Sequence, residues 1–319
     1  MEINIVLYFH SMFYGFLKIW VRLGLFLFAK SIRIFGKQQL QQTGPLVLAI
    51  NHPNSFLDAI LLGVFMKQPV HFLTRGDAFK NKYVRSVLRH INMLPIYRIR
   101  DGKDKLSLNQ QTFELSEQVL MSGGILLVFV EGFCEHQTTL QLPLKKGAPR
   151  VIESCWRKAV PVEILPVWLH YSSFTSFGKC IDISLGNVLT PFEHLSGKDP
   201  AIVWQLINQK TANGLKDLEH HVTHKKPTIS VLFKTILSMP ALLGAVLHAP
   251  LYLPLQSIVY RHTRHEVHYD SVLLVVLLLV YPVFLIGLGI ALAVQTSWPW
   301  FFLPIIGMPL LARAFVLWK

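Results

Sequence analysis

The longest hydrophobic stretch lies near the end of the chain, where no charged residue occurs between Asp270 and Arg313. A helix that crosses a bilayer needs roughly 20 predominantly apolar residues, so this stretch can hold two such helices. Polar residues around Ser297 divide it. We therefore predict a transmembrane helical hairpin, about Ser271–Val294 and Trp300–Trp318. A buried helical pair in a soluble core is the alternative, and it fits a charge-free run of this length less well.

The N-terminal segment combines apolar residues with a stripe of cations. Residues 3–29 are mostly apolar, and four basic residues lie within or just after them: Lys18, Arg22, Lys30 and Arg33. On a continuous helix these cations fall within an arc of roughly 120°. An apolar helix with a basic stripe favours an amphipathic anchor that lies on anionic lipid, and a true span that begins near Ile3 is the alternative.

A third hydrophobic segment carries three prolines. Ile229–Tyr260 contains a single charged residue, Lys234, and is interrupted by Pro240, Pro250 and Pro254. Because proline removes a helical hydrogen bond and kinks or ends a helix, one straight span is disfavoured. We predict short interfacial or re-entrant helices here.

Between these segments, short apolar runs alternate with helical patterns. The runs of strand length are Leu46–Ile50, Val70–Thr74, Ile125–Val130 and Val162–Tyr171. The helical patterns are Leu57–Met66, Lys82–His90 and Leu108–Ser122. Such alternation predicts an α/β fold with a mostly parallel sheet. The chain thus divides into N-terminal membrane-anchoring helices (1–35), an α/β domain (36–226), interfacial or re-entrant helices (227–260) and a transmembrane helical hairpin (261–319).

Composition narrows the class of partner. The chain has a formal net charge of +13 although 52% of its residues are hydrophobic. That combination excludes a disordered chain and favours contact with anionic membrane lipid over contact with nucleic acid. The three cysteines are widely spaced, so we expect neither a disulfide framework nor a zinc ribbon. No nucleotide-binding glycine motif occurs, and the histidine clusters near 220 and 265 lack a complete ligand set, so we predict no cofactor and no metal.

One polar turn carries candidate chemistry. The first strand passes directly into Asn51-His52-Pro53-Asn54-Ser55-Phe56-Leu57-Asp58, and a helical pattern follows. Polar residues at the carboxyl end of a strand lie where α/β sheets usually bind ligands. Histidine titrates near neutral pH, so His52 can act as a general base, and Asp58 can fold back to orient its ring. The spacing leaves two other interpretations open: Ser55 and Asp58 form a capping box, and His52 bonds only to backbone.

This turn resembles the His-Asp motif of the glycerolipid acyltransferases, and three further blocks match that family in order. Ile91–Arg98 resembles the second block. Val128–Gly132 with Leu142–Gly147 resembles the third, and Ile164–Val167 resembles the fourth. Four ordered blocks over about residues 36–190 are specific, although any one alone would be weak.

The resemblance implies a glycerolipid acyltransferase fold and acyl transfer from a thioester to a lipid hydroxyl. It implies acyl-CoA or acyl-carrier protein as donor, a lysophospholipid as acceptor, and a membrane-bound enzyme of phospholipid synthesis. The best-known members acylate 1-acylglycerol-3-phosphate, which gives phosphatidate. The matching positions are the catalytic pair His52 and Asp58 and the acceptor-binding residues Arg98, Glu131, Gly132 and Lys145.

The chain departs from the family pattern in the His-Asp motif and in the third block. Five residues rather than the usual four separate His52 from Asp58, and Val130, Phe133 and Cys134 replace the usual proline, threonine and arginine. These changes allow a different acceptor, either glycerol-3-phosphate or a lysolipid without phosphate. A non-catalytic membrane lipid-binding protein is the alternative from another class. We interpret Cys134, next to the third block, as a packing thiol.

Charge also predicts the orientation in the membrane. Arginine or lysine flanks the hairpin at both ends, whereas the loop at about residues 295–300 has no charge. The positive-inside rule places both flanks in the cytoplasm. We therefore expect an integral protein of the cytoplasmic (inner) membrane whose catalytic domain faces the cytoplasm.

Overall fold

The computed structural model describes residues 2–97, 108–191, 198–221, 230–263 and 266–319. Its strands are β1 (Ala29–Phe35), β2 (Leu46–Ile50), β3 (Val70–Arg75), β4 (Met93–Ile96), β5 (Ile125–Phe129), β6 (Glu163–Tyr171) and β7 (Lys179–Leu185). Its α-helices are α1 (Glu2–Phe28), α2 (Phe56–Phe65), α3 (Lys82–His90), α5 (Leu108–Met121), α6 (Gly147–Arg157), α7 (Pro200–His221), α8 (Val231–Thr263), α9 (Tyr269–Gln295) and α10 (Phe302–Trp318).

In the described part of the chain, seven strands form one sheet in the order β1-β7-β6-β2-β5-β3-β4. Neighbouring strands are parallel except β6 and β7. The predicted mostly parallel sheet is therefore confirmed, and its four predicted strands are β2, β3, β5 and β6. Ile50 at the end of β2 pairs with Phe129 of β5 and Val167 of β6, so this register aligns the carboxyl ends of β2 and β5.

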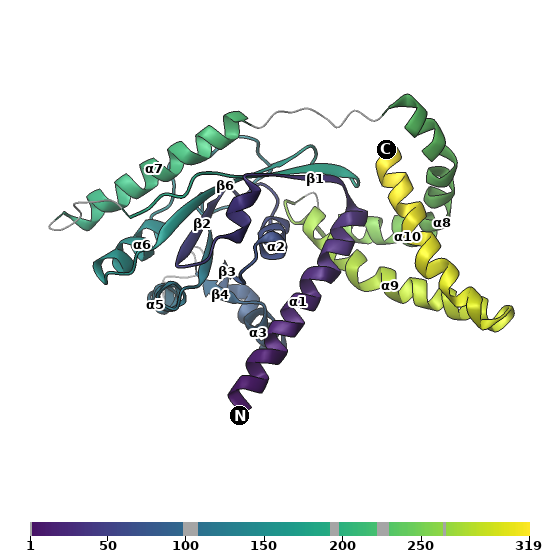
Figure 1. Ribbon diagram of the computed structural model, residues 1–319, viewed down its shortest axis with the longest axis horizontal. Coiled ribbons are helices and arrows are strands. Elements are labelled where there is room, and N and C mark those ends of the chain that lie inside the picture. Colours follow the sequence, from purple (N-terminus) through teal and green to yellow (C-terminus); the bar gives the residue numbers. More distant parts are fainter. Residues whose placement is uncertain (1, 98–107, 192–197, 222–229, 264–265) are drawn as a thin grey trace.

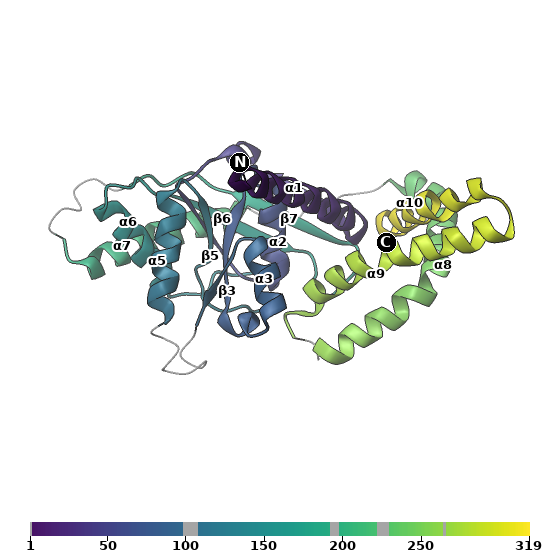
Figure 2. The same cartoon turned by 90° about the horizontal axis from the view of Figure 1, so that it is seen from below.

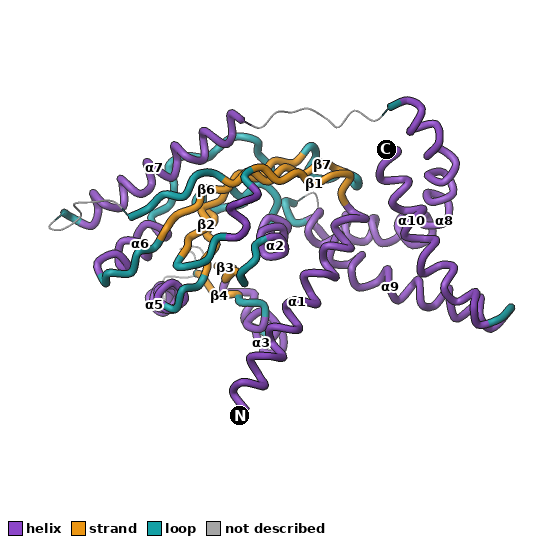
Figure 3. The backbone as a smooth tube through the Cα atoms, viewed as in Figure 1, coloured by secondary structure: helices purple, strands orange, loops and turns teal. Residues whose placement is uncertain are grey.

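Helices cover both faces of the sheet. Leu46, Leu48 and Ile50 of β2 belong to one core with residues of α1, α2 and α9, whereas Val47 and Ala49 belong to a second core with residues of α5, α6 and α7. This division follows from the alternation of side chains along a strand. Figures 1 and 3 show α5, α6 and α7 together at one end of the molecule and α8, α9 and α10 at the other.

The N-terminal region differs from its prediction. Residues 2–28 form one helix, but Ala29–Phe35 is strand β1, which pairs with β7. The predicted set of anchoring helices over 1–35 is therefore wrong for its last residues, and the sheet domain begins before residue 36. Because Lys30 and Arg33 lie on a strand, they cannot share a helical stripe with Lys18 and Arg22.

The two helical cations contact the protein itself. Lys18 Nζ donates to the carbonyl of Met66 at 2.6 Å, and the Arg22 guanidinium donates to the carbonyl of Val64 at 2.7 Å. These carbonyls lie at the end of α2, where unpaired acceptors and the helix dipole favour positive charge. The expectation that the cations face lipid is thus wrong. The apolar residues of α1 divide between two sides. Val21, Leu25 and Phe28 are buried in the core, whereas the exposed ones are Met12, Phe13, Phe16, Ile19, Leu23 and Phe26.

The proline-rich segment also differs from its prediction. Residues 231–263 form one helix, α8, rather than separate short helices, although Pro240, Pro250 and Pro254 lie inside it. Figure 1 shows that α8 changes direction along its length, as expected of a helix that contains prolines.

The predicted helical hairpin is confirmed. Helix α9 ends at Gln295, a 3-10 turn follows at Trp298–Phe301, and α10 returns toward the sheet. In the described residues, three helices are long and apolar enough to cross a membrane: α8, α9 and the segment 298–318. The far end of α10 touches the domain, since Lys319 Nζ donates to the carbonyl of Phe177 at 3.0 Å and Arg313 donates to that of Ala29 at 2.7 Å. Figure 2 shows the end of α1 that leads into β1 beside α9 of this hairpin.

Candidate active site

The candidate site lies at the carboxyl end of β2. Ile50 is followed by the buried Asn51, whose side-chain amide exchanges two hydrogen bonds with the backbone of Leu169 at 2.9 and 2.8 Å. These bonds fix the start of the turn against β6. The turn then reaches α2 at Phe56, so His52 stands between a strand end and a helix start. Parallel sheets commonly bind ligands at this position.

His52 and Asp58 form a hydrogen-bonded pair. His52 Nδ1 lies 2.9 Å from Asp58 Oδ2, and the imidazole packs flat on the ring of Phe129 with centroids 3.5 Å apart. The Asp58 side chain is fully buried, whereas that of His52 is 16% exposed. Because the carboxylate occupies Nδ1, Nε2 is the ring nitrogen left to exchange a proton with a bound molecule. The alternative interpretation, in which His52 bonds only to backbone, is therefore wrong.

The capping-box interpretation of Asp58 is wrong as well. Ser55 makes no side-chain capping bond, and its φ of 55° lies in the left-handed region. The Asp58 carboxylate accepts the N–H of Asn54 at 2.8 Å on Oδ2 and the hydroxyl of Tyr171 at 2.6 Å on Oδ1. Burial, followed by the charge of Asp58, raises the pKa of Tyr171 well above its usual range. The Tyr171 hydroxyl therefore remains a donor to Asp58.

Glu131 holds the turn from the adjacent strand end. Its Oε2 accepts the backbone N–H of His52 at 2.8 Å, while Oε1 accepts from the Gln137 amide and the Gln141 N–H, each at 2.9 Å. Burial raises the pKa of Glu131, and these hydrogen bonds oppose that rise. Both oxygens thus have protein partners, and the predicted contact of Glu131 with an acceptor stays a prediction.

Gly132 and Lys145 lie together next to Glu131. Gly132 has a φ of +72°, and a Cβ built on it would stand 2.5 Å from Cγ of Lys145. Lys145 is exposed, and its N–H donates to the carbonyl of Val130 at 2.8 Å. The third family block therefore brings a cation to the edge of the sheet that carries His52. Arg98 lies outside the described residues.

Cys134 packs beneath the turn. Its Sγ accepts the N–H of Ser55 at 3.0 Å. Burial, with a smaller effect of the Asp58 charge, raises the pKa of this thiol to about 12. A thiol with that pKa is protonated at neutral pH, which agrees with a packing role.

Several contacts of the turn escaped the sequence analysis. Tyr171 approaches Asp58 from 113 positions along the chain, and Asp270 and Ser271 approach Asn54 from 216 and 217. Tyr171 ends a predicted strand, so its position at the sheet edge was accessible from the sequence, but its partner was not. Nothing in the local pattern indicated that the first turn of the hairpin would reach Asn54.

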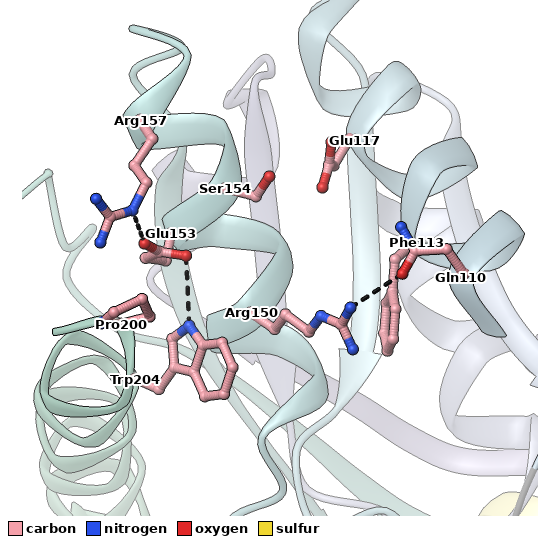
Figure 4. Close-up of a pocket in the computed structure, with 9 residues that line it drawn as sticks. All are labelled: Gln110, Phe113, Glu117, Arg150, Glu153, Ser154, Arg157, Pro200 and Trp204. Atoms are coloured by element: carbon pink, nitrogen blue, oxygen red, sulfur yellow. Dashed lines mark hydrogen bonds and ion pairs between the residues drawn. The ribbon is translucent and has the colours of Figure 1, made fainter. Parts of the chain in front are cut away.

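We also searched the described residues for metal-ligand clusters and for pockets away from His52. In the described residues, no group of three histidine, cysteine, aspartate or glutamate side chains is placed to hold a metal ion. A shallow pocket of about 380 Å³ opens between α5, α6 and α7. Figure 4 shows that Arg150 donates to Gln110, at 3.0 Å, and that Glu153 accepts from Arg157 and Trp204. Neither His52 nor Asp58 lines it.

Comparison with known proteins places this geometry in a family. Residues 31–170 match the acyltransferase family model. Over 193 residues the chain is 25% identical to the 1-acyl-sn-glycerol-3-phosphate acyltransferase of Bacillus subtilis (strain 168), which covers 59% of this chain and 88% of that protein. The crystal structure of the 1-acyl-sn-glycerophosphate acyltransferase PlsC from Thermotoga maritima aligns with a TM-score of 0.46 and 18% identity, covering 66% of this chain and 81% of that one. The matched residues include the His52 turn, Asp58 and the Glu131 block. These findings support assignment of this domain to the glycerolipid acyltransferase family and identify the chain as an O-acyltransferase.

Proposed function

We propose that this protein transfers an acyl chain from a thioester to the free hydroxyl of 1-acylglycerol-3-phosphate and so forms phosphatidate. The observation that carries the proposal is the 2.9 Å contact between His52 Nδ1 and the buried Asp58, at a strand end inside an acyltransferase domain. The name of the Bacillus subtilis relative supports the choice of acceptor.

In the proposed reaction His52 is the general base. Its Nε2 takes the proton of the acceptor hydroxyl as that oxygen attacks the thioester carbonyl. The tetrahedral intermediate then expels the thiolate, which receives the proton from His52, so no covalent acyl-enzyme forms. Asp58 holds the imidazole in one tautomer and stabilises the imidazolium. A positioned base contributes about 10²–10⁴-fold, and alignment of the two bound substrates contributes further.

The acceptor phosphate would bind to cations at the same edge of the sheet. Lys145 supplies a point charge beside Gly132, and Arg98 would supply a two-pronged guanidinium. Glu131 would act through His52, because its hydrogen bond to the His52 backbone holds the base in place. The donor would be acyl-CoA or acyl-carrier protein from the cytoplasm.

A second candidate keeps the chemistry and changes the acceptor. Cys134 accepts a hydrogen bond from Ser55 where many family members have an arginine, and the neighbouring Phe133 is 42% exposed. An apolar side chain there would favour an acceptor with less negative charge. Glycerol-3-phosphate and a phosphate-free lysolipid are therefore the competing acceptors. A non-catalytic lipid-binding protein would have no need of the His52–Asp58 pair.

A substrate panel tests the proposal. Detergent-solubilised full-length protein is offered 1-acylglycerol-3-phosphate, glycerol-3-phosphate and a phosphate-free lysolipid, each with acyl-CoA and with acyl-carrier protein. We expect the highest kcat/KM with 1-acylglycerol-3-phosphate and no transfer by His52→Ala. A phosphate-free acceptor that outperforms it would move the assignment to the second candidate. If His52→Ala kept more than a tenth of wild-type turnover, the mechanism would be wrong, since a base contributes about 10²-fold or more.

A further inference from the structure

The first turn of α9 packs against the turn that carries His52. Asn54 is fully buried, and its amide donates to Asp270 Oδ2 at 2.8 Å. The Ser271 hydroxyl donates to the carbonyl of Asn54 at 3.0 Å and accepts the N–H of Leu57 at 2.9 Å. Ser271 therefore satisfies a free N–H at the start of α2, which a capping residue of α2 itself would ordinarily do.

Asn54 transmits this packing to the candidate catalytic pair. Its own N–H donates to Asp58 Oδ2 at 2.8 Å, and the same oxygen faces His52 Nδ1 at 2.9 Å. A continuous series of hydrogen bonds thus runs from Asp270 through Asn54 and Asp58 to His52. Ser55 adds a parallel contact, because its hydroxyl shares a 2.5 Å hydrogen bond with Nδ1 of His268, just before α9.

Asp270 is held in turn by Lys179 at the start of β7. The Lys179 ammonium donates to Asp270 Oδ2, and both side chains are completely buried. Within the described residues, Oδ1 of Asp270 and Oδ1 of Asn54 have no hydrogen-bond partner. A buried ion pair with unsatisfied oxygens is a poor source of stability, since well-packed apolar residues often do as well or better. The arrangement is better explained by the precise placement of Asn54.

We propose that Asp270, held by Lys179, and Ser271 are positioning residues for His52 and Asp58, so that the first hairpin helix completes the active site. The proposal rests on the proposed function, which makes His52 the base. All three positioning residues lie outside residues 31–170, the part of the chain that matches the acyltransferase family model. Misplacement of a reacting group by about 1 Å can cost on the order of 10²-fold in rate.

Two double variants separate positioning from stability. Lys179→Met with Asp270→Asn removes both charges but keeps a side-chain oxygen to accept from Asn54. Lys179→Met with Asp270→Leu removes both charges and that acceptor. In full-length protein purified in detergent, we expect the Leu variant to lose at least tenfold in kcat with KM for both substrates within threefold. The Asn variant should retain kcat within threefold.

Asp182→Asn is the matched control. Asp182 is also a buried carboxylate on β7, paired with Arg33 at 2.6 Å, and no described contact joins it to the His52 turn. Its kcat should remain within threefold of wild type. Equal kcat in the two double variants, whether high or low, would overturn the proposal, as would a change confined to KM.

Two further variants keep the outcome decisive. If the double variants do not fold, Ser271→Ala tests the positioning role in their place. We expect this variant to lose threefold to tenfold in kcat with unchanged KM. An unchanged kcat would overturn the proposal. His52→Ala, measured in the same assay, distinguishes a failure of the proposed function from a failure of the positioning role. An active His52→Ala refutes the proposed function, whereas an inactive one beside a fully active Leu variant refutes only the positioning role.

Discussion

The Tyr171 hydroxyl donates a 2.6 Å hydrogen bond to Oδ1 of Asp58, the carboxylate oxygen opposite the one that faces His52. Asp58 is therefore held from both sides, by the end of β6 on one oxygen and by Asn54 and His52 on the other. A carboxylate fixed in this way can orient an imidazole without rotating. The pair thus depends on a strand whose last residue is far away in the sequence.

Tyr171→Phe should lower kcat about tenfold and leave KM for both substrates nearly unchanged. Hydrogen bonds to charged groups contribute about 1.5–3 kcal/mol, and part of that is expected to appear in the transition state because Asp58 stabilises the imidazolium. Steady-state kinetics of the purified protein measure the effect. Tyr83→Phe, at an exposed position on α3, is the control. A Tyr171→Phe enzyme with wild-type kcat would show that the hydrogen bond only supports the fold.

Asp58→Asn should cost less than His52→Ala but still at least about 10²-fold in kcat, because the amide cannot hold the imidazole in the same tautomer. The variant removes a negative charge that accepts from both Tyr171 and Asn54. Circular dichroism and detergent extraction should match those of the wild type. A kcat within tenfold of wild type would remove Asp58 from the proposed mechanism.

Gly132→Ala should raise the KM for the acceptor at least as much as Lys145→Ala does, with a smaller effect on the thioester. The new methyl group would stand 2.5 Å from Cγ of Lys145 and must push that side chain away, and the φ of +72° adds roughly 1–2 kcal/mol of strain for a residue with a Cβ. Gly15→Ala, where nothing lies within 4 Å, is the control. An equal or larger effect on the thioester would assign Lys145 to the donor.

The parts of the fold that the sequence predicted are those set by local pattern. β2, α3 and the two hairpin helices follow from strand-length apolar runs, helical periodicity and a charge-free stretch. The His52 turn followed from its position at a strand end and from its likeness to a family motif. These signals depend on neighbouring residues, so a single sequence contains them.

The features that the sequence analysis did not predict depend on contacts between distant parts of the chain. Helical periodicity showed that Lys18 and Arg22 share one face of α1, but it did not show that this face lies on the end of α2. The apolar run of α1 passes into β1 without a break, so the start of the sheet was missed. Asp270 and Lys179 meet through the tertiary fold, and nothing in their local sequence indicates a buried ion pair.

Cys134 should resist alkylation although it lies beside the candidate base. A pKa of about 12 leaves on the order of one thiol in 10⁴ ionised at pH 8, far fewer than for a free cysteine with a pKa near 8.5. Iodoacetamide at pH 8, followed by mass spectrometry, should modify Cys180 before Cys134, although both side chains are partly exposed. Cys134→Ala should keep kcat within about fivefold. Rapid labelling of Cys134 in the folded protein would contradict the packing role.

The topology prediction combines charge with the contacts of the hairpin. The start of α9 contacts the His52 turn through Asp270, and the end of α10 contacts the sheet domain through Lys319. Both ends of the hairpin therefore lie on the domain side, and Ser297 lies at the far end. The positive-inside rule places the basic ends in the cytoplasm, where soluble thioester donors are found.

Single-cysteine labelling of intact cells tests this orientation in a background without Cys134, Cys155 and Cys180. A membrane-impermeant maleimide should label Ser297→Cys from outside and should not label Lys37→Cys or Lys198→Cys, although all three positions are exposed. Permeabilised cells are the control, because all three variants should then react. Labelling of Lys198→Cys in intact cells would reverse the orientation. It would place the candidate base on the side of the membrane that lacks acyl-CoA and acyl-carrier protein, and the proposed donors would be wrong.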